Sequence, residues 1–354
     1  LILDPKFAQA HHGLGLANVG LKNIDEALEN FRNAIKLKDD YLDAINNYGY
    51  ALQENKQYHD SIEVFEKALS LDNNFLRAYN NLGKAHVDNG TVKKAKEIFY
   101  KGLKIDENYT PILKNLADLC ILLREFTEAE EILHSILEKD PESAEAFNAL
   151  GSIYEKRGEL KKSEKYLKKS LKLKPDLFGA KLNLIAIKQH YGEIYEAEKS
   201  LEELLKEKED SPSLNNNLAY IYLALGKFND GWAKYEYRWQ VFPGIRVRWP
   251  KSDGELWSGQ KDKSIVLWRE QGIGDLIIFL GLVPEAFKSS KSLSVYIDPR
   301  LISLCSRSML GINFLPDEEA VKKEVFDYHL PMGSLPRLFR NSEKDFERTT
   351  KGYL

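Results

Sequence analysis

The sequence contains little cysteine, little net charge and no long apolar run. Its 354 residues include two cysteines, Cys120 and Cys305, which have no metal-ligand spacing. We therefore expect reduced, buried thiols and a cytoplasmic protein. The net charge of −3 comes without a basic stripe, which argues against a nucleic-acid partner. The longest apolar run, Leu276 to Val283, is shorter than the ~20 residues of a membrane-spanning helix, so no span is predicted.

Two further absences concern histidine pairs and tryptophan. The seven histidines form neither an HxxxH nor an HExxH pattern, so no metal site is predicted. Tryptophan is absent before Trp232, and all five tryptophans lie between Trp232 and Trp268. Large aromatic side chains bury about 150–250 Å² each. We therefore expect this cluster to attach the region before Trp232 to the region that follows it.

A pattern of 34 residues recurs without a gap from near the start of the chain. In the unit that begins at Leu76, small residues occupy the eighth place (Gly83) and the twentieth place (Ala95). They let two antiparallel helices approach, and Leu82 and Phe99 fill the seam between them. Such a period predicts helix pairs that each pack on their neighbours. The seven full units begin at Ala8, Leu42, Leu76, Thr110, Ala144, Phe178 and Pro212.

Asparagine recurs at the sixth place of five units. Helix propensity does not explain this recurrence, because asparagine is a middling helix former. An amide offers both donors and an acceptor, which suits the backbone of an extended peptide. The alternative is inheritance from a duplicated unit, with solvated amides. The residues are Asn47, Asn81, Asn115, Asn183 and Asn217.

The 34-residue pattern resembles the tetratricopeptide repeat. Its asparagine series is similar to that of the repeat region of O-linked N-acetylglucosamine transferases. The resemblance covers Ala8 to about Val241 and implies a right-handed superhelical solenoid whose concave groove binds a protein or an extended peptide. The first residues, LILDP, match the tail of an earlier unit, because Pro5 stands 34 residues before Asp39. We therefore expect this chain to be a fragment of a longer protein.

From Ser264 the period is lost and short strands alternate with helices. We expect strands at 264–268, 293–297, 312–315 and 326–330, helices at 275–287 and 302–309, and a loop at 331–334. This alternation predicts a parallel, doubly wound sheet, whose ligands lie beyond the carboxyl ends of the strands. The candidate ligand residues are Gln271, Gly272, Gly274, Asp275, Asp298, His329 and Ser334.

The Gly272-Ile273-Gly274 turn is the centre of this predicted site. Glycines let the backbone approach a ligand closely, and the following helix start suits an anion. A dinucleotide fingerprint would need a third glycine where this chain has Ile277, which argues against nicotinamide or flavin binding. Asp275 is either a ligand-facing carboxylate or a cap of its own helix.

Five segments in order resemble bacterial proteins that join tetratricopeptide repeats to a glycosyltransferase. Their catalytic part is similar to heptosyltransferases of glycosyltransferase family 9. The segments are Trp232–Trp239, Arg248–Pro250, Leu256–Gly259, Glu270–Phe279 and Phe326–Pro336.

The resemblance implies the first half of a GT-B fold. Asp275 would be the general base on an acceptor hydroxyl, with Glu270 and Gln271 lining the acceptor side. The second half, which binds most of the nucleotide-sugar donor, is not in this chain. We therefore expect no cofactor here and no activity of the fragment by itself.

The predicted fold class is mainly α, followed by a partial α/β Rossmann-like domain. The solenoid spans residues 1–242, a Trp-rich linker spans 243–263, and the α/β segment spans 264–354. An alternative function stays open, in which the repeats are a non-catalytic scaffold for protein–protein interaction and the α/β segment is a degenerate appendage.

Overall fold

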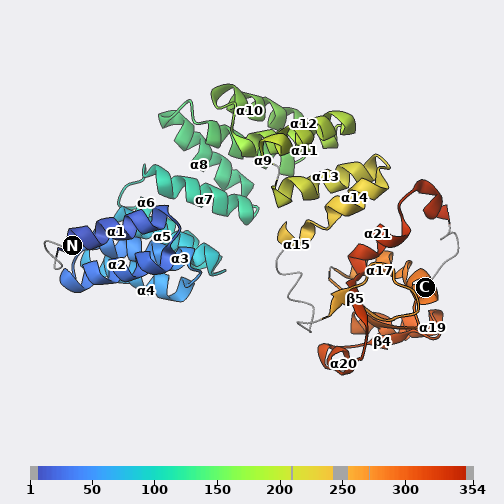
Figure 1. Ribbon diagram of the computed structural model, residues 1–354. Coiled ribbons are helices and arrows are strands. Elements are labelled where there is room, and N and C mark those ends of the chain that lie inside the picture. Colours follow the sequence, from blue (N-terminus) through green and yellow to red (C-terminus); the bar gives the residue numbers. More distant parts are fainter. Residues whose placement is uncertain (1–6, 209, 242–253, 271, 348–354) are drawn as a thin grey trace. The chain divides into compact units, whose positions relative to one another are not determined.

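The structure is a computed structural model that describes residues 7–208, 210–241, 254–270 and 272–347. The chain divides into two compact units, Leu1–Ile187 and Lys188–Leu354. The first is helical, and the second combines helices with a sheet (Figure 1). Among the helices that the structure describes, none has both the length and the apolar composition needed to cross a bilayer.

The 34-residue units are helix pairs. Every predicted unit start is the first residue of a helix, which confirms the phase of the pattern. From α1 to α10, each helix packs on the next helix along the chain. The helices are α1 (Ala8–Gly20), α2 (Ile24–Leu37), α3 (Leu42–Glu54), α4 (Tyr58–Leu71), α5 (Leu76–Asp88), α6 (Val92–Leu103), α7 (Thr110–Leu122), α8 (Phe126–Lys139), α9 (Ala144–Lys156), α10 (Leu160–Leu173) and α11 (Phe178–His190).

Close approach between the paired helices depends on the small eighth place. Gly83 on α5 faces the Phe99 ring on α6, and a Cβ at Gly83 would overlap that ring. Gly49 faces Phe65 in the same way, with its Cβ position 2.6 Å from the ring. Both rings are fully buried. Phe99 therefore lies in the seam between the paired helices as predicted, and the structure shows that the eighth place packs on the ring of the twenty-fourth place.

Each described pair turns through a left-handed residue at the fifteenth place. Gly90 has φ +76°. Lys56 adopts φ 59°, although a residue with a Cβ atom disfavours this left-handed backbone. The backbone N–H of the following residue then donates a hydrogen bond to a carbonyl in the last turn of the helix. For example, Thr91 N–H donates to the His86 carbonyl at 2.8 Å. Lysine and arginine therefore hold a strained backbone where other units have glycine.

We expect Lys56→Gly to stabilise the chain by roughly 0.5–1 kcal/mol. Glycine removes the steric cost of the left-handed backbone, although its larger unfolded-state entropy offsets part of the gain. The control Lys67→Gly, at an exposed interior position of α4, should instead lose roughly 0.5–1 kcal/mol. Guanidinium denaturation followed by circular dichroism measures both. A lower midpoint for Lys56→Gly than for the parent would contradict the strain.

The second unit contains further helices and a five-stranded parallel sheet. The strand order is β1-β5-β2-β3-β4. The elements are α12 (Ile194–Glu207), α13 (Pro212–Ala224), α14 (Phe228–Tyr235), α15 (Arg238–Val241), β1 (Glu255–Leu256), β2 (Ser264–Trp268), α17 (Ile273–Leu280), α18 (Val283–Ser289), β3 (Ser292–Tyr296), α19 (Pro299–Ser308), β4 (Asn313–Leu315), α20 (Glu318–Lys323), β5 (Tyr328–Pro331), η1 (Met332–Ser334), α21 (Leu335–Phe339) and η2 (Glu343–Asp345).

Strand order reverses between β2 and β5. The chain builds β2, β3 and β4 outward in one direction and then returns to place β5 on the other side of β2. The carboxyl ends of β2 and β5 therefore flank the reversal, which is where open parallel sheets form a crevice. Leu267 and Val266 show how the sheet is buried, because alternate side chains face opposite sides. Leu267 joins the core beneath α17, α18 and α19, and Val266 joins the core with α20.

Several local expectations need correction. The predicted helix at 275–287 is two helices, because α17 ends before Gly281 and Pro284 stands in the first turn of α18. The predicted loop at 331–334 is mostly the 3-10 turn η1. The sheet gains β1, which lies within the predicted linker and is too short to show a periodic pattern. Residues 242–253 lie outside the described residues, so the linker's bounds stay a prediction.

Candidate functional site

The sixth-place asparagines bond from one helix pair to the preceding pair. Each acceptor stands at the fifth place of the preceding unit, 35 residues earlier in sequence. We call these contacts amide rungs. The contacts are Asn47–His12 (2.9 Å), Asn81–Asn46 (3.0 Å), Asn115–Asn80 (2.7 Å) and Asn183–Asn148 (2.9 Å).

The amide rungs account for four of the five sixth-place asparagines, all except Asn217. Ala149 replaces asparagine at the sixth place of the fifth unit, and the preceding fifth place is Lys114, whose ammonium cannot accept a hydrogen bond. Leu182, at the fifth place of the sixth unit, has no polar side-chain atom, and Asn217 in the next unit is exposed. This partner was not predicted, because its signal in the sequence is a 35-residue offset instead of the 34-residue period.

The rungs leave hydrogen-bonding capacity for a ligand. Asn115 is half-buried and uses one N–H on Asn80. Its second N–H and its carbonyl oxygen have no partner in the part of the chain that the structure describes. Asn81 has less capacity, because its carbonyl oxygen accepts from Asn80 at 3.2 Å.

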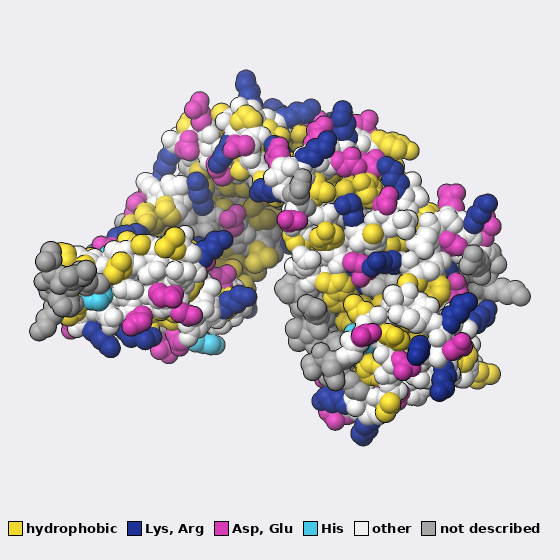
Figure 2. Space-filling view, viewed as in Figure 1, with side chains coloured by type: hydrophobic (Ala, Val, Ile, Leu, Met, Phe, Trp, Pro, Cys, Tyr) yellow, Lys and Arg dark blue, Asp and Glu magenta, His cyan; other side chains and the backbone are white. Residues whose placement is uncertain are grey.

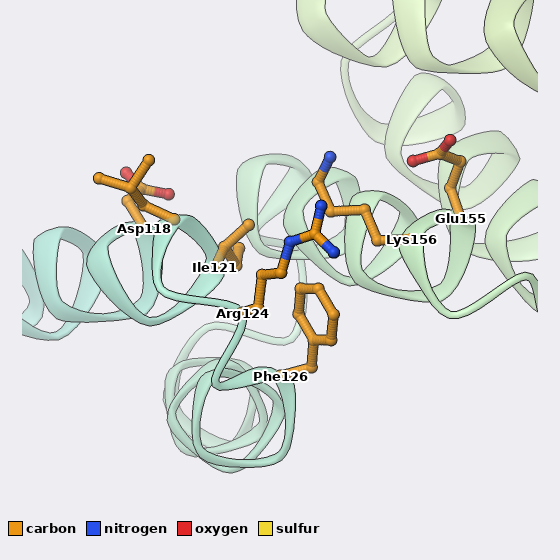
Figure 3. Close-up of a pocket in the computed structure, with 7 residues that line it drawn as sticks. Asp118, Ile121, Arg124, Phe126, Glu155 and Lys156 are labelled. Atoms are coloured by element: carbon orange, nitrogen blue, oxygen red, sulfur yellow. The ribbon is translucent and has the colours of Figure 1, made fainter.

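A cavity of about 560 Å³ lies at the carboxyl-terminal end of α7 and is called here the groove pocket. Asp118 stands one helical turn beyond Asn115 on α7, so the two side chains share a helix face. In Figure 3, Arg124 and Lys156 point toward the middle of the pocket, with Asp118 and Glu155 on either side. The lining is Asp118, Ile121, Leu122, Arg124, Phe126, Glu155 and Lys156.

The groove pocket combines apolar side chains with two cations and two carboxylates. Leu122, the last residue of α7, is 63% exposed although its side chain is apolar. Neither Arg124 nor Lys156 forms an ion pair with any residue in the described ranges. Such a pocket suits an apolar side chain with an adjacent peptide carbonyl or carboxylate.

At the sheet edge, the structure exposes the Gly272–Asp275 turn. Gly272 is the N-cap residue of α17, and Gly272, Gly274 and Asp275 are all exposed beyond the carboxyl end of β2. Asp275 is exposed in the first turn of α17, and among the described residues its carboxylate forms no hydrogen bond with the backbone of that helix. Gln271 lies outside the described residues.

Glu270 and Ser334 lie together at the β2–β5 crevice, where they bind Arg238 of α15. The Arg238 guanidinium is 1% exposed and holds Glu270 through Nη2–Oε2 at 3.1 Å. It also donates to Ser334 Oγ at 2.7 Å and to Glu236 Oε1 at 2.8 Å. Burial raises the pKa of Glu270 against the lowering effect of Arg238. The crevice thus contains a buried ionic cluster that joins a helix to the sheet.

Asp298 and His329 also have protein partners. Asp298 caps α19 and pairs with Arg300 at 2.9 Å and Arg269 at 3.1 Å. Hydrogen bonds from Arg300 lower the pKa of Asp298 to about 2. His329 lies within β5, where its Nδ1 is 3.1 Å from the Trp268 indole nitrogen. It is buried, so it does not extend from the strand end as the sequence analysis expected.

The tryptophan cluster connects the last helices to the sheet within the second unit. Trp232 on α14 donates to the Arg340 carbonyl at 2.7 Å. Trp239 on α15 packs on Trp268 of β2 with ring centroids 5.6 Å apart. Trp249 lies outside the described residues. These contacts, together with Arg238, are those expected of a packed junction.

One group of three side chains has the geometry of metal ligands among the described residues, namely Cys120, Glu125 and Glu128. The Lys96 ammonium lies 2.6 Å from Glu125 and 2.7 Å from Glu128 and neutralises part of their charge. Burial raises the pKa of Cys120 to about 12, so the thiol stays protonated near neutral pH. A protonated thiol beside an ammonium group is a poor metal site.

The helices match known repeats. Models described as tetratricopeptide repeat match residues 8–41, 86–153 and 144–177, and a model described as TPR repeat matches residues 49–90. Residues 8–41 and 49–177 therefore carry tetratricopeptide repeats. This confirms the resemblance of the 34-residue units and makes the array a module suited to protein binding.

Two solved structures share this fold. A tetratricopeptide repeat protein from Parabacteroides merdae has a TM-score of 0.57 at 17% identity, covering 65% of this chain and 91% of its own. PilF of Pseudomonas aeruginosa has a TM-score of 0.50 at 17% identity, covering 60% and 97%. Protein FlbA of Caulobacter vibrioides is 35% identical over 95 residues, which are 25% of this chain and 16% of FlbA. The chain therefore spans a small part of that relative.

Proposed function

We propose that this chain is the peptide-binding part of a glycosyltransferase. The tetratricopeptide repeat array holds an extended polypeptide. The α/β region supplies the acceptor side of a site that transfers a sugar from a nucleotide-sugar donor to a hydroxyl group. The observation that carries the catalytic part is Asp275, an exposed carboxylate in the first turn of α17, beside the strand-order reversal.

Backbone recognition by the array is supported by the amide positions. Asn115 keeps a donor and an acceptor after its rung is made, and Asn217 is exposed with no partner in the described chain. Amides pair with peptide N–H and C=O groups without selecting side chains. The groove pocket, lined by Asp118 one helical turn beyond Asn115, then offers a place for one side chain of the bound polypeptide.

The sheet supports the glycosyltransferase side of the proposal. The order β4-β3-β2-β5 has the arrangement of the first four strands of a doubly wound, Rossmann-like sheet, as in the first half of a GT-B fold. A carboxylate at this edge is chemically suited to accept the proton of an attacking sugar or protein hydroxyl. Gly272 and Gly274 leave room for a ligand beside it, since no heavy atom blocks a Cβ at Gly274.

A non-catalytic scaffold is the second candidate function. The observation that favours it is the ionic cluster at the β2–β5 crevice, where Glu270 and Ser334 are committed to Arg238. Asp298 and His329 are likewise bonded within the protein. On this alternative, the sheet edge is a structural junction and the array acts by binding alone.

Asn217→Ala is the clean test of backbone recognition. A peptide selected from a degenerate library of short unstructured peptides serves as the probe, and its affinity is measured by fluorescence anisotropy. We expect roughly a tenfold loss, the equivalent of about 1.4 kcal/mol, with unchanged thermal stability because Asn217 makes no rung. Asn115→Ala should lower both affinity and stability, because it removes a rung as well. Unchanged affinity in both variants would rule out recognition by these amides.

A further inference from the structure

A second cavity, distinct from the groove pocket, lies between α8, α9 and α10. Its volume is about 380 Å³. It adjoins Phe147 near the start of α9, whereas the groove pocket adjoins Lys156 at the end of that helix. We call it the α10 cavity. Its lining is His134, Leu137, Pro141, Phe147, Lys165, Tyr166 and Lys169.

One wall of the α10 cavity is a rigid aromatic stack. Tyr166 stacks on Tyr154 with ring centroids 5.4 Å apart and an interplanar angle of 5°. Its ring is also 6.2 Å from the Phe147 ring at 19°. Phe147 is 5% exposed. Because the rings hold one another in place, this wall presents a preformed apolar surface to a side chain.

The cations of the α10 cavity lack counter-charges. Lys165 and Lys169 stand one turn apart on α10, and Lys169 Nζ lies 3.9 Å from the Phe147 ring centroid. Neither forms an ion pair in the described part of the protein, and no carboxylate lines the cavity. Three other lysines near this helix are neutralised. They are Lys162 by Glu159 (2.5 Å), Lys168 by Glu164 (2.5 Å) and Lys174 by Glu145 (2.9 Å).

We propose that the α10 cavity binds an acidic polypeptide segment. Its carboxylates pair with Lys165 and Lys169, and an apolar side chain between them lies on the aromatic wall. The composition of α10 supports a negatively charged ligand, since its sequence has six lysines and one glutamate. This site acts independently of the sugar-transfer proposal and of the groove.

The neighbouring helix argues against a long polyanion as the ligand. The sequence of α8 has four glutamates and one lysine, so negative charge lies directly beside the cavity. Figure 2 shows Lys and Arg side chains over the part of the surface where α10 lies in Figure 1, with Asp and Glu side chains close by. A duplex or an anionic membrane would meet both signs of charge, whereas a short acidic segment fits the cavity alone.

The test uses a fluorescein-labelled peptide library built from glutamate and aspartate with one leucine, phenylalanine or tryptophan. Lys165→Glu/Lys169→Glu is compared with Lys161→Glu/Lys172→Glu, which makes the same charge change on the same helix at exposed positions outside the cavity. We expect the cavity variant to lose at least about tenfold in affinity and the control to lose less than about threefold. Circular dichroism checks that both variants remain folded.

Further measurements separate binding at the α10 cavity from binding by general charge attraction. Replacing the apolar residue of the selected peptide with asparagine should weaken it about tenfold, because the aromatic wall then has no partner. Equal losses in the two lysine variants would overturn the site, since only general charge would matter. So would tighter binding of a DNA duplex or of phosphatidylserine vesicles than of the peptides, or no peptide binding at all.

Discussion

Arg238→Met is expected to destabilise the second unit by about 3–5 kcal/mol. The guanidinium is almost completely buried and satisfies Glu270, Glu236 and Ser334 at the β2–β5 crevice. Its removal takes the Arg238 counter-charge away from the Glu270 carboxylate, which is itself only 2% exposed. A buried, unpaired charge costs far more than the loss of a surface ion pair.

Two matched variants separate burial from the loss of charge. Arg238→Met/Glu270→Gln should recover much of the loss, because no unpaired charge remains. Arg300→Met removes an arginine that pairs with Asp298 but whose side chain is 73% exposed, so its effect should stay within about 1 kcal/mol. Urea denaturation followed by tryptophan fluorescence measures this unit directly, since every tryptophan lies between Trp232 and Trp268. Equal losses for Arg238→Met and Arg300→Met would contradict the buried cluster.

Asp275→Asn is expected to lower sugar transfer by the product of the complete gene by about 10²–10⁴-fold, the usual contribution of a positioned general base. The substitution keeps the shape of the side chain and removes the proton acceptor. Affinity for the donor should change little, because the proposal places the donor mainly on the other half of the enzyme. Nucleotide release measures turnover, and titration with the nucleotide sugar measures donor affinity.

Asp298→Asn is the matched control for this assay. Both carboxylates lie at the sheet edge, but Arg300 and Arg269 lower the pKa of Asp298 to about 2, which makes it a weak base at neutral pH. Asp298→Asn should therefore affect stability more than turnover. If Asp275→Asn retained near-normal turnover, Asp275 would be removed from the chemistry.

Periodic features of the fold were predictable from the sequence, because they depend on local size and polarity. Residues equivalent to Gly83 and Phe99 recur every 34 residues. The helix pairs and their first residues could therefore be predicted by counting along the sequence. The run Ser264–Trp268 is β2 residue for residue, since five consecutive apolar or small residues suit a strand buried on both faces. The break at Gly281 inside an apolar stretch was missed, because the apolar run continues through it.

The contacts of the candidate site were harder to predict. Arg238 stands in a segment rich in charged and aromatic residues, and a charged residue there is ordinarily taken as solvent-exposed. Only the fold brings it to Glu270 and Ser334, which are 32 and 96 residues away in sequence. The rung between Asn115 and Asn80 was missed for a similar reason, because its partner lies in the preceding unit at a different place of the repeat.

Mass spectrometry of a bound peptide tests the proposed function most directly. The product of the complete gene is incubated with a hydroxyl-bearing peptide that binds the repeat array and with a panel of nucleotide sugars. The account predicts that the peptide gains the mass of one sugar residue with at least one donor, and that Asp275→Asn abolishes this gain while the peptide still binds. A peptide that binds the array but keeps its mass with every donor would contradict the transferase and favour the scaffold.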